Sequence, residues 1–321
     1  MLDSFINQFW PSTIDGLSLG AIYALLALGY TMVYGVLRLI NFAHADIFMA
    51  GTFAALWSVQ MLGVDDATGI ALIGAVAVSA VAAAIVAGGG ALVLERVAYR
   101  PLRKRGASRL AALISAIGAS IFIQQLFATE IVHRVFDTSR EGGKLPVTEQ
   151  FREITTVFTL GPVRVTNVAL IIVVGAVLMM VALDLFVNRT KLGRGIRSTA
   201  QDPQTAVLMG VNIDRVVSVT FVVGGVMAGV AAALYFLRFE QTEYFVGFLL
   251  GIKAFTAAVL GGIGNIRGAL VGGFVLGLLE MYGSSIFGSE WRDVVAFTLL
   301  ILILMFRPTG ILGESLQRAR A

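Results

Sequence analysis

The run IALIGAVAVSAVAAAIVAGGGALVL, residues 70–94, contains no charged side chain and leads directly into the basic stretch ERVAYRPLRKR, residues 95–105. A helix needs about 20 apolar residues to cross the roughly 30 Å hydrocarbon core of a bilayer. Residues 70–94 exceed that length. Lys and Arg concentrate in the cytoplasmic loops of membrane proteins. This stretch therefore predicts a membrane-spanning helix that ends on the cytoplasmic side.

The overall composition indicates the same class of protein. Apolar residue types make up 57% of the 321 residues and charged types 14%, and the mean hydropathy is +0.86. A soluble domain would carry roughly 25% charged residues to cover its surface. The chain has no cysteine and two histidines, His44 and His133, so we expect no disulfide, metal or cofactor. No basic stripe interleaved with aromatic residues points to nucleic acid.

Other apolar runs follow the same pattern. The sequence predicts an all-α integral membrane protein that forms a single domain over residues 1–321, with about eight or nine spanning helices. The segment 245–262 contains Lys253 and is the least typical of a straight helix, so we allow for one broken or re-entrant segment. The first twelve residues lack Lys and Arg, so we expect the first run to stay in the mature protein. The further runs are Gly16–Leu37, Phe42–Leu62, Leu110–Thr129, Val168–Val187, Val216–Leu237, Phe245–Gly262, Ala269–Phe287 and the shorter Val294–Phe306.

The basic residues lie in three clusters, which face the same side if the N-terminus is outside and there are nine spans. The segment of about 130–166, whose charges nearly balance, then lies outside. The segment of about 188–215 lies in the cytoplasm. The clusters follow the third span, the fifth span and the last span: Arg96, Arg100, Arg103, Lys104, Arg105 and Arg109; Arg189, Lys191, Arg194, Arg197 and Arg215; Arg307, Arg318 and Arg320.

A short helix is predicted at residues 202–210 of the second basic loop. Asp202 can accept the free N–H groups of the first turn, and Pro203 suits the first helical position, which needs no donor. Gly210 suits a left-handed stop. A capped helix of this kind in a loop can dock a partner protein, or it can lie on the membrane surface. Spacing alone favours neither interpretation.

Three long motifs make the chain resemble the branched-chain amino acid permeases of the LivH type, which belong to ABC importers. The motifs are GYTMVYGVLRLINFAHAD at residues 29–46, GRGIRSTAQDP at 193–203 with GVN at 210–212, and KAFTAAVLGGIGNIRGA at 253–269. The resemblance covers nearly the whole chain. Ala45 stands where the family usually has Gly, and Arg267 stands where Pro is common.

The resemblance implies that the loop helix docks in a groove of a cytoplasmic ATPase and passes its motion to the spans. It implies an ATPase-coupling site at Arg194, Gly195, Ala200, Asp202, Ala206, Gly210 and Asn212.

Two other segments are candidates for the translocation pathway. Asn41, His44 and Asp46 join the first two apolar runs, and polar groups at membrane depth suggest a cavity or pathway. We favour a broken helix that lines this pathway over a cytoplasmic turn beside Arg38. The small residues from Gly261 to Gly277 favour close helix packing, with a hinge or pathway role as the alternative. The pathway candidates are Asn41, His44, Asp46, Gly261, Gly262, Gly264 and Asn265.

The resemblance implies a non-enzymatic permease subunit in a bacterial inner membrane, with a periplasmic N-terminus and a cytoplasmic C-terminus. It implies import of leucine, isoleucine or valine. Its partners would be a second homologous permease, two ATPase subunits, a periplasmic binding protein and the lipid bilayer. The chain has no Walker A sequence, so ATP would bind elsewhere. Permeases for urea or short amides stay open, as does an ion-coupled secondary transporter that uses Asp46 or Glu280.

Overall fold

Helices occupy every apolar run described above. The computed structural model describes residues 2–63, 66–136, 144–146, 151–160, 163–307 and 309–313. Its long helices are α1 (Leu2–Leu37), α2 (His44–Leu62), α3 (Gly69–Leu94), α5 (Arg109–Leu126), α7 (Asn167–Arg189), α10 (Ile213–Phe239), α11 (Val246–Gly261), α12 (Ile266–Phe287) and α13 (Arg292–Phe306).

Seven helical segments within the described ranges are long and apolar enough to cross a membrane. The helix α11 has 16 residues and α13 has 15. At about 1.5 Å per residue, each is several ångströms shorter than a hydrocarbon core of roughly 30 Å. The all-α membrane class is therefore supported, but the expected count of eight or nine spans is not confirmed. The shortfall lies in the segment with Lys253 and in the last apolar run. The seven are 8–37, 44–62, 69–104, 109–136, 167–189, 213–239 and 266–287.

Two spanning segments contain a π-helical turn. The helix α3 continues through η1 (Glu95–Tyr99) into α4 (Arg100–Lys104), and α5 continues through η2 (Phe127–Ile131) into α6 (Val132–Phe136). In η1 the Arg100 N–H donates to the Glu95 carbonyl, five residues back, directly before Pro101. Pro101 has no N–H and so cannot continue the α-helical ladder at this point.

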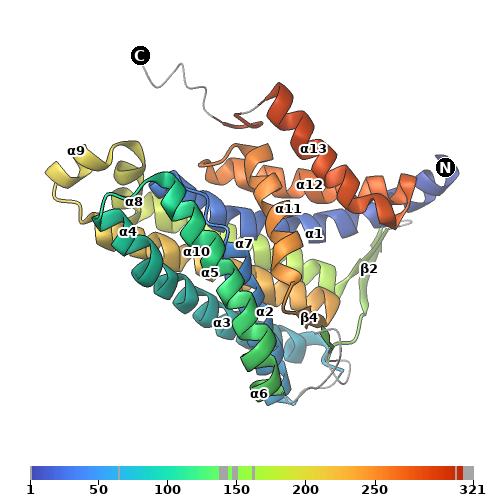
Figure 1. Ribbon diagram of the computed structural model, residues 1–321. Coiled ribbons are helices and arrows are strands. Elements are labelled where there is room, and N and C mark those ends of the chain that lie inside the picture. Colours follow the sequence, from blue (N-terminus) through green and yellow to red (C-terminus); the bar gives the residue numbers. More distant parts are fainter. Residues whose placement is uncertain are drawn as a thin grey trace.

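Short strands lie outside the spanning helices. The strand β1 (Lys144–Pro146) pairs antiparallel with β4 (Gln241–Glu243), and β2 (Thr156–Leu160) pairs antiparallel with β3 (Val163–Thr166). In Figure 1, β2, β4 and the N-terminus lie away from the end that holds α4, α8 and α9. Three of the four strands belong to the segment that we expect outside. Its residues 137–143, 147–150 and 161–162 lie outside the described ranges.

The helix α1 forms the centre of the molecule, and 94% of its most apolar window is buried. It packs closely against α12 because small residues face one another. A Cβ atom added at Gly277 would overlap the backbone of Gly20, and one added at Gly273 would overlap Ala24. Without side chains between them, the two helices pack backbone against backbone. The close packing that the small residues of α12 predicted is therefore present.

Gly277→Val is expected to prevent the native packing of α1 on α12. The added branched side chain would overlap backbone atoms of Gly20 and Gly16, which cannot move without displacing α1. Overpacking of this kind costs about 1–3 kcal/mol or more. We expect a lower midpoint of thermal unfolding and a smaller monodisperse fraction in detergent. Gly89→Val is the matched control, because a Cβ at Gly89 meets no atom within 4 Å among the described residues. Equal unfolding midpoints for the two variants would contradict this account.

Candidate functional site

The loop between α7 and α10 forms two helices, α8 (Lys191–Gln201) and α9 (Pro203–Leu208). The Asp202 carboxylate caps α9 by accepting from the Gln204 backbone N–H at 2.9 Å, and the Thr205 hydroxyl bonds to its other oxygen. Pro203 lies in the first turn, and Gly210 has a left-handed φ of +83°. The predicted cap, first position and stop are therefore confirmed.

The end of α9 presents an apolar face to the exterior. Val207, Leu208 and Met209 are 54%, 85% and 80% exposed. On the inner side of the same helix, Ala206 is buried at 2%. Exposed aliphatic side chains on a polar loop are unfavourable in water, so the face is suited to a partner surface. In Figure 1, α9 projects from one end of the molecule.

Other candidate coupling residues hold this loop against the spanning helices. Arg38, at the end of α1, donates to the Ala200 carbonyl at 3.3 Å. A Cβ at Gly195 would lie 3.2 Å from a Val216 methyl group, so α8 packs closely on α10. Asn212 caps α10 by accepting from the Arg215 N–H at 3.0 Å. Arg194 is exposed. The seven candidate coupling residues therefore all lie in the connected stretch formed by α8, α9 and the cap of α10.

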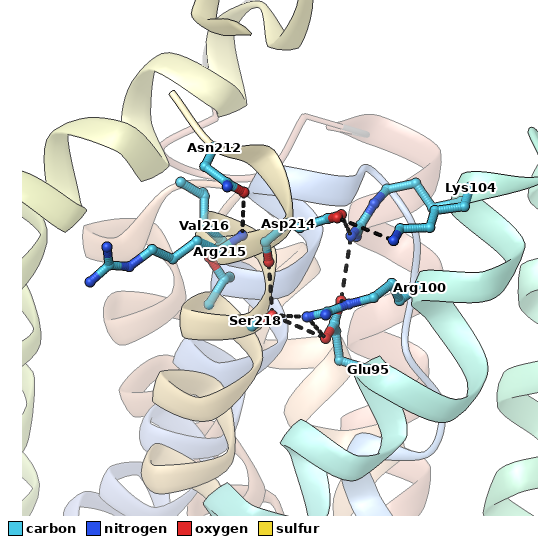
Figure 2. Close-up of polar contacts among 10 residues, drawn as sticks. Glu95, Arg100, Lys104, Asn212, Asp214, Arg215, Val216 and Ser218 are labelled. Atoms are coloured by element: carbon cyan, nitrogen blue, oxygen red, sulfur yellow. Dashed lines mark hydrogen bonds and ion pairs between the residues drawn. The ribbon is translucent and has the colours of Figure 1, made fainter. Parts of the chain in front are cut away.

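A cluster of charged side chains around the buried Glu95 joins the start of α10 to the α3–α4 junction (Figure 2). Glu95 is fully buried, and Arg100 bonds both of its carboxylate oxygens at 3.2 and 2.9 Å. The Ser218 hydroxyl donates to Glu95 at 3.1 Å, and Arg103 pairs with Asp214 at 2.5 Å. Because Asp214 lies two residues after the Asn212 cap, the cluster ties the coupling loop to α3. The basic stretch at residues 95–105 predicted that cations gather here, but it did not predict which side chains they contact.

Asp202→Ala is expected to loosen the first turn of α9. Hydrogen bonds from the Thr205 side chain, and then from the Thr205 and Gln204 backbone, hold the pKa of Asp202 below its usual value. The charged cap is therefore present at neutral pH and lost only as the pH falls through that lowered pKa. Amide hydrogen exchange of Gln204 and Thr205 at pH 7 should become roughly fivefold faster. Asp202→Asn keeps an acceptor and is the control. Unchanged exchange in Asp202→Ala would show that the cap does not stabilise α9.

The three polar candidates at the start of α2 and just before it are buried. Asn41, His44 and Asp46 are 2%, 1% and 1% exposed. The Tyr99 hydroxyl donates to the Asn41 side-chain oxygen at 3.1 Å. The His44 ring lies against Gly29 of α1, where any Cβ would overlap the imidazole. The chain breaks between α1 and α2 at residues 38–43, with Asn41 buried and Phe42 exposed.

Asp46 faces a cavity of about 580 Å³. Elements far apart in the sequence form its walls, including α1, α2, α5, α11 and α13. Most of its lining is aliphatic or aromatic, and Asp46 is the only ionisable carboxylate among the described lining residues. The lining residues are Tyr30, Ile40, Phe42, Ala45, Asp46, Ile117, Ser120, Ile121, Gln124, Phe245, Phe248, Gly251, Ile252, Phe255 and Leu300.

The pathway candidates at residues 261–265 do not line this cavity; they lie at the end of α11 and in the turn to α12. Gly262 and Gly264 have left-handed φ values of +105° and +97° and form the turn between α11 and α12. Asn265 caps α12 by accepting from the Arg267 and Gly268 N–H groups. Its side-chain nitrogen donates to the Leu312 carbonyl at 2.8 Å. Gly261 packs against the Gly268 backbone. The cavity lining includes none of these residues, nor Asn41 or His44.

A second buried charge group lies between α1, α11, α12 and α13, and sequence reasoning did not assemble it. Lys253 is 4% exposed and Glu280 is fully buried. Lys253 Nζ lies 2.9 Å from Glu280 Oε1 and 2.6 Å from Asp293 Oδ1. The Tyr23 hydroxyl donates to Glu280 Oε2 at 2.9 Å. Glu280 is therefore paired, and a single Lys in an apolar run was the signal for it.

Comparison with known proteins gives similarity along nearly the whole chain. A family model described as branched-chain amino acid transport system / permease component matches residues 12–304. The chain is 42% identical over 311 residues to the high-affinity branched-chain amino acid transport system permease protein BraD of Pseudomonas aeruginosa, covering 96% of this chain and 97% of that protein. It is also 42% identical over 320 residues to LivH of Escherichia coli, another such permease, covering 98% of each.

Proposed function

This chain belongs to the family of branched-chain amino acid transport permeases, and from that membership we propose that it is the membrane-spanning subunit of an importer that moves leucine, isoleucine and valine into the cytoplasm. The observation that carries the proposal is 42% identity to BraD and LivH over nearly the full length. ATP hydrolysis would take place on separate ATPase subunits, so the chain itself is not an enzyme.

The exposed end of α9 is the proposed contact with an ATPase. Leu208 and Met209 are 85% and 80% exposed and would enter an apolar groove of that partner. The capping residues keep the helix formed, and Gly195 and Asn212 hold the loop on α10. Movement of α9 would reach α3 through the Arg103–Asp214 ion pair. The seven coupling residues would therefore act as one rigid connection rather than as seven separate contacts.

The cavity beside Asp46 is the proposed part of the pathway within this subunit. Cavities of about 300–1,000 Å³ with apolar walls and few polar groups are typical of small-molecule sites. A wall of Ile and Phe side chains suits an aliphatic cargo. Asn41 and His44 would support this region from behind. Gly261, Gly262, Gly264 and Asn265 would serve the pathway as the turn that positions α11.

The proposed arrangement in the membrane follows from the basic loops. The chain would lie in a bacterial inner membrane as one permease domain, with residues of about 130–166 in the periplasm and of about 188–215 in the cytoplasm. Its N-terminus would be periplasmic and its C-terminus cytoplasmic. The complete transporter would contain a second homologous permease and two ATPase subunits, and a periplasmic binding protein would deliver the cargo.

Affinity purification from the native host in mild detergent tests this assembly. We expect two Walker-containing ATPase chains and a second permease to co-purify, as identified by mass spectrometry. A variant with Leu208→Asp should recover the second permease with far less ATPase. Recovery of the folded, active chain without any ATPase would contradict the proposal and favour a secondary transporter.

A further inference from the structure

The Asp46 carboxylate is buried but only partly satisfied. Gln124 Nε2 donates to Asp46 Oδ1 at 2.8 Å. The other oxygen, Oδ2, is buried and has no hydrogen-bond partner among the residues that the structure describes. A buried, ionised carboxylate is costly unless it is paired. The described lining of its cavity contains no Lys, Arg or His and so supplies no cation there.

The cavity combines this one acid with an aliphatic and aromatic wall. Ile117, Ile121, Ile252, Phe248 and Phe255 line it, as do three neutral polar side chains, Tyr30, Ser120 and Gln124. A ligand that fits must bring a positive group for Asp46 and apolar surface for the wall. An aliphatic amino acid has both, and its own carboxylate could accept from the neutral donors.

We propose that Asp46 binds the α-ammonium group of the transported amino acid in this cavity, with the aliphatic side chain against the Ile and Phe wall. This inference rests on the proposed function and adds the group that recognises the head of the cargo. Gln124 then has a positioning role, because its hydrogen bond fixes one oxygen and leaves the other without a hydrogen-bond partner among the described residues.

Small residues let α11 and α2 approach closely beside the cavity. Gly251 faces Ala45 and the Tyr30 hydroxyl, and a Cβ at Gly251 would overlap the Ala45 side chain and lie 3.2 Å from that hydroxyl. Small residues on α11 and α2 therefore let these helices pack closely beside Tyr30 and Asp46. A larger residue at position 251 would displace Ala45, which directly precedes Asp46 in α2.

The first test uses the complete transporter in proteoliposomes. Uptake of radiolabelled leucine by Asp46→Asn should fall at least about tenfold in kcat/KM, because the amide keeps the shape and loses the charge. Co-purification of the ATPase subunits should match wild type, which shows that the variant assembles. Asp184→Asn is the matched control, because Asp184 lies near the end of α7 and bonds Asn188 at 2.9 Å. We expect this control to transport leucine normally.

The second test measures binding directly, by saturation-transfer NMR on the transporter in nanodiscs without binding protein. Three probes separate the groups of the ligand: leucine, isoamylamine without the carboxylate, and 4-methylpentanoate without the ammonium. Wild type should saturate leucine and isoamylamine more strongly than 4-methylpentanoate, and Asp46→Asn should remove that preference.

The possible results separate this inference from the proposed function. An Asp46→Asn variant that transports leucine normally, or that keeps the amine preference, overturns the role of Asp46 and leaves the importer intact. Equal signals for the three probes in wild type, or no signal, also overturn it. A wild-type complex that imports no branched-chain amino acid overturns the proposed function instead.

Discussion

Lys253→Ala should lower the free energy of unfolding by about 3–5 kcal/mol, since removal of one partner leaves the other charge buried without its ion pair. Glu280 is fully buried, and its Oε1 atom accepts from Lys253 at 2.9 Å. Tyr23 would remain as its donor on Oε2. Arg292 lies 3.7 Å away and is partly exposed, so it does not replace the lost hydrogen bond. The expected readout is a lower unfolding midpoint by intrinsic tryptophan fluorescence in detergent.

Two further variants separate charge from packing at this site. Lys253→Met combined with Glu280→Gln removes both charges, keeps an acceptor for Tyr23, and should recover most of the lost stability. Lys191→Ala removes an exposed lysine outside the spans and should leave the midpoint unchanged. A double variant as unstable as Lys253→Ala alone would show that the loss comes from packing and not from an uncompensated charge.

Leu208→Asp should weaken association with the ATPase by at least about 30-fold, the equivalent of an interface hot spot of about 2 kcal/mol. Leu208 is 85% exposed, so the substitution removes no internal contact of the permease. A carboxylate placed in an apolar groove would also be desolvated without a partner. We expect leucine uptake and stimulated ATPase activity to fall together, while the unfolding midpoint of the isolated permease stays unchanged.

Gln204→Asp is the matched control for Leu208→Asp. It adds the same charge to α9 at an exposed polar position near the helix start, where an acid is compatible with the helix dipole. Affinity can be measured by titrating labelled permease with purified ATPase. If Leu208→Asp binds as tightly as Gln204→Asp, the exposed end of α9 is not the docking surface.

The features that the sequence alone predicted depend on local chemistry. Long apolar runs determine the spanning helices, because backbone groups in lipid must bond within the segment. The α9 helix follows from Asp202, Pro203 and Gly210, whose roles are set by the nearest residues in the chain. The close packing of α12 follows from its small residues. In each case the signal lies within a few turns of one helix.

The features that were missed depend on contacts between distant segments. Asp46 and Gln124 are 78 positions apart, and Tyr23 and Glu280 are 257 apart. No pattern within one run says which helices will meet. The span count of eight or nine is not confirmed, because the helices α11 and α13 have 16 and 15 residues and are short for spanning helices. A lone Lys and a lone Glu in neighbouring apolar runs were the one available sign of the Lys253–Glu280 pair.

Leucine uptake by the reconstituted transporter tests the central claim most directly. Proteoliposomes would contain this permease, its paired permease and the ATPases, with ATP or ADP trapped where the ATPases lie and loaded binding protein on the opposite side. Our account predicts accumulation of radiolabelled leucine that requires both ATP and the binding protein and is unaffected by collapse of the proton gradient. Accumulation with ADP driven by an imposed proton gradient would contradict it.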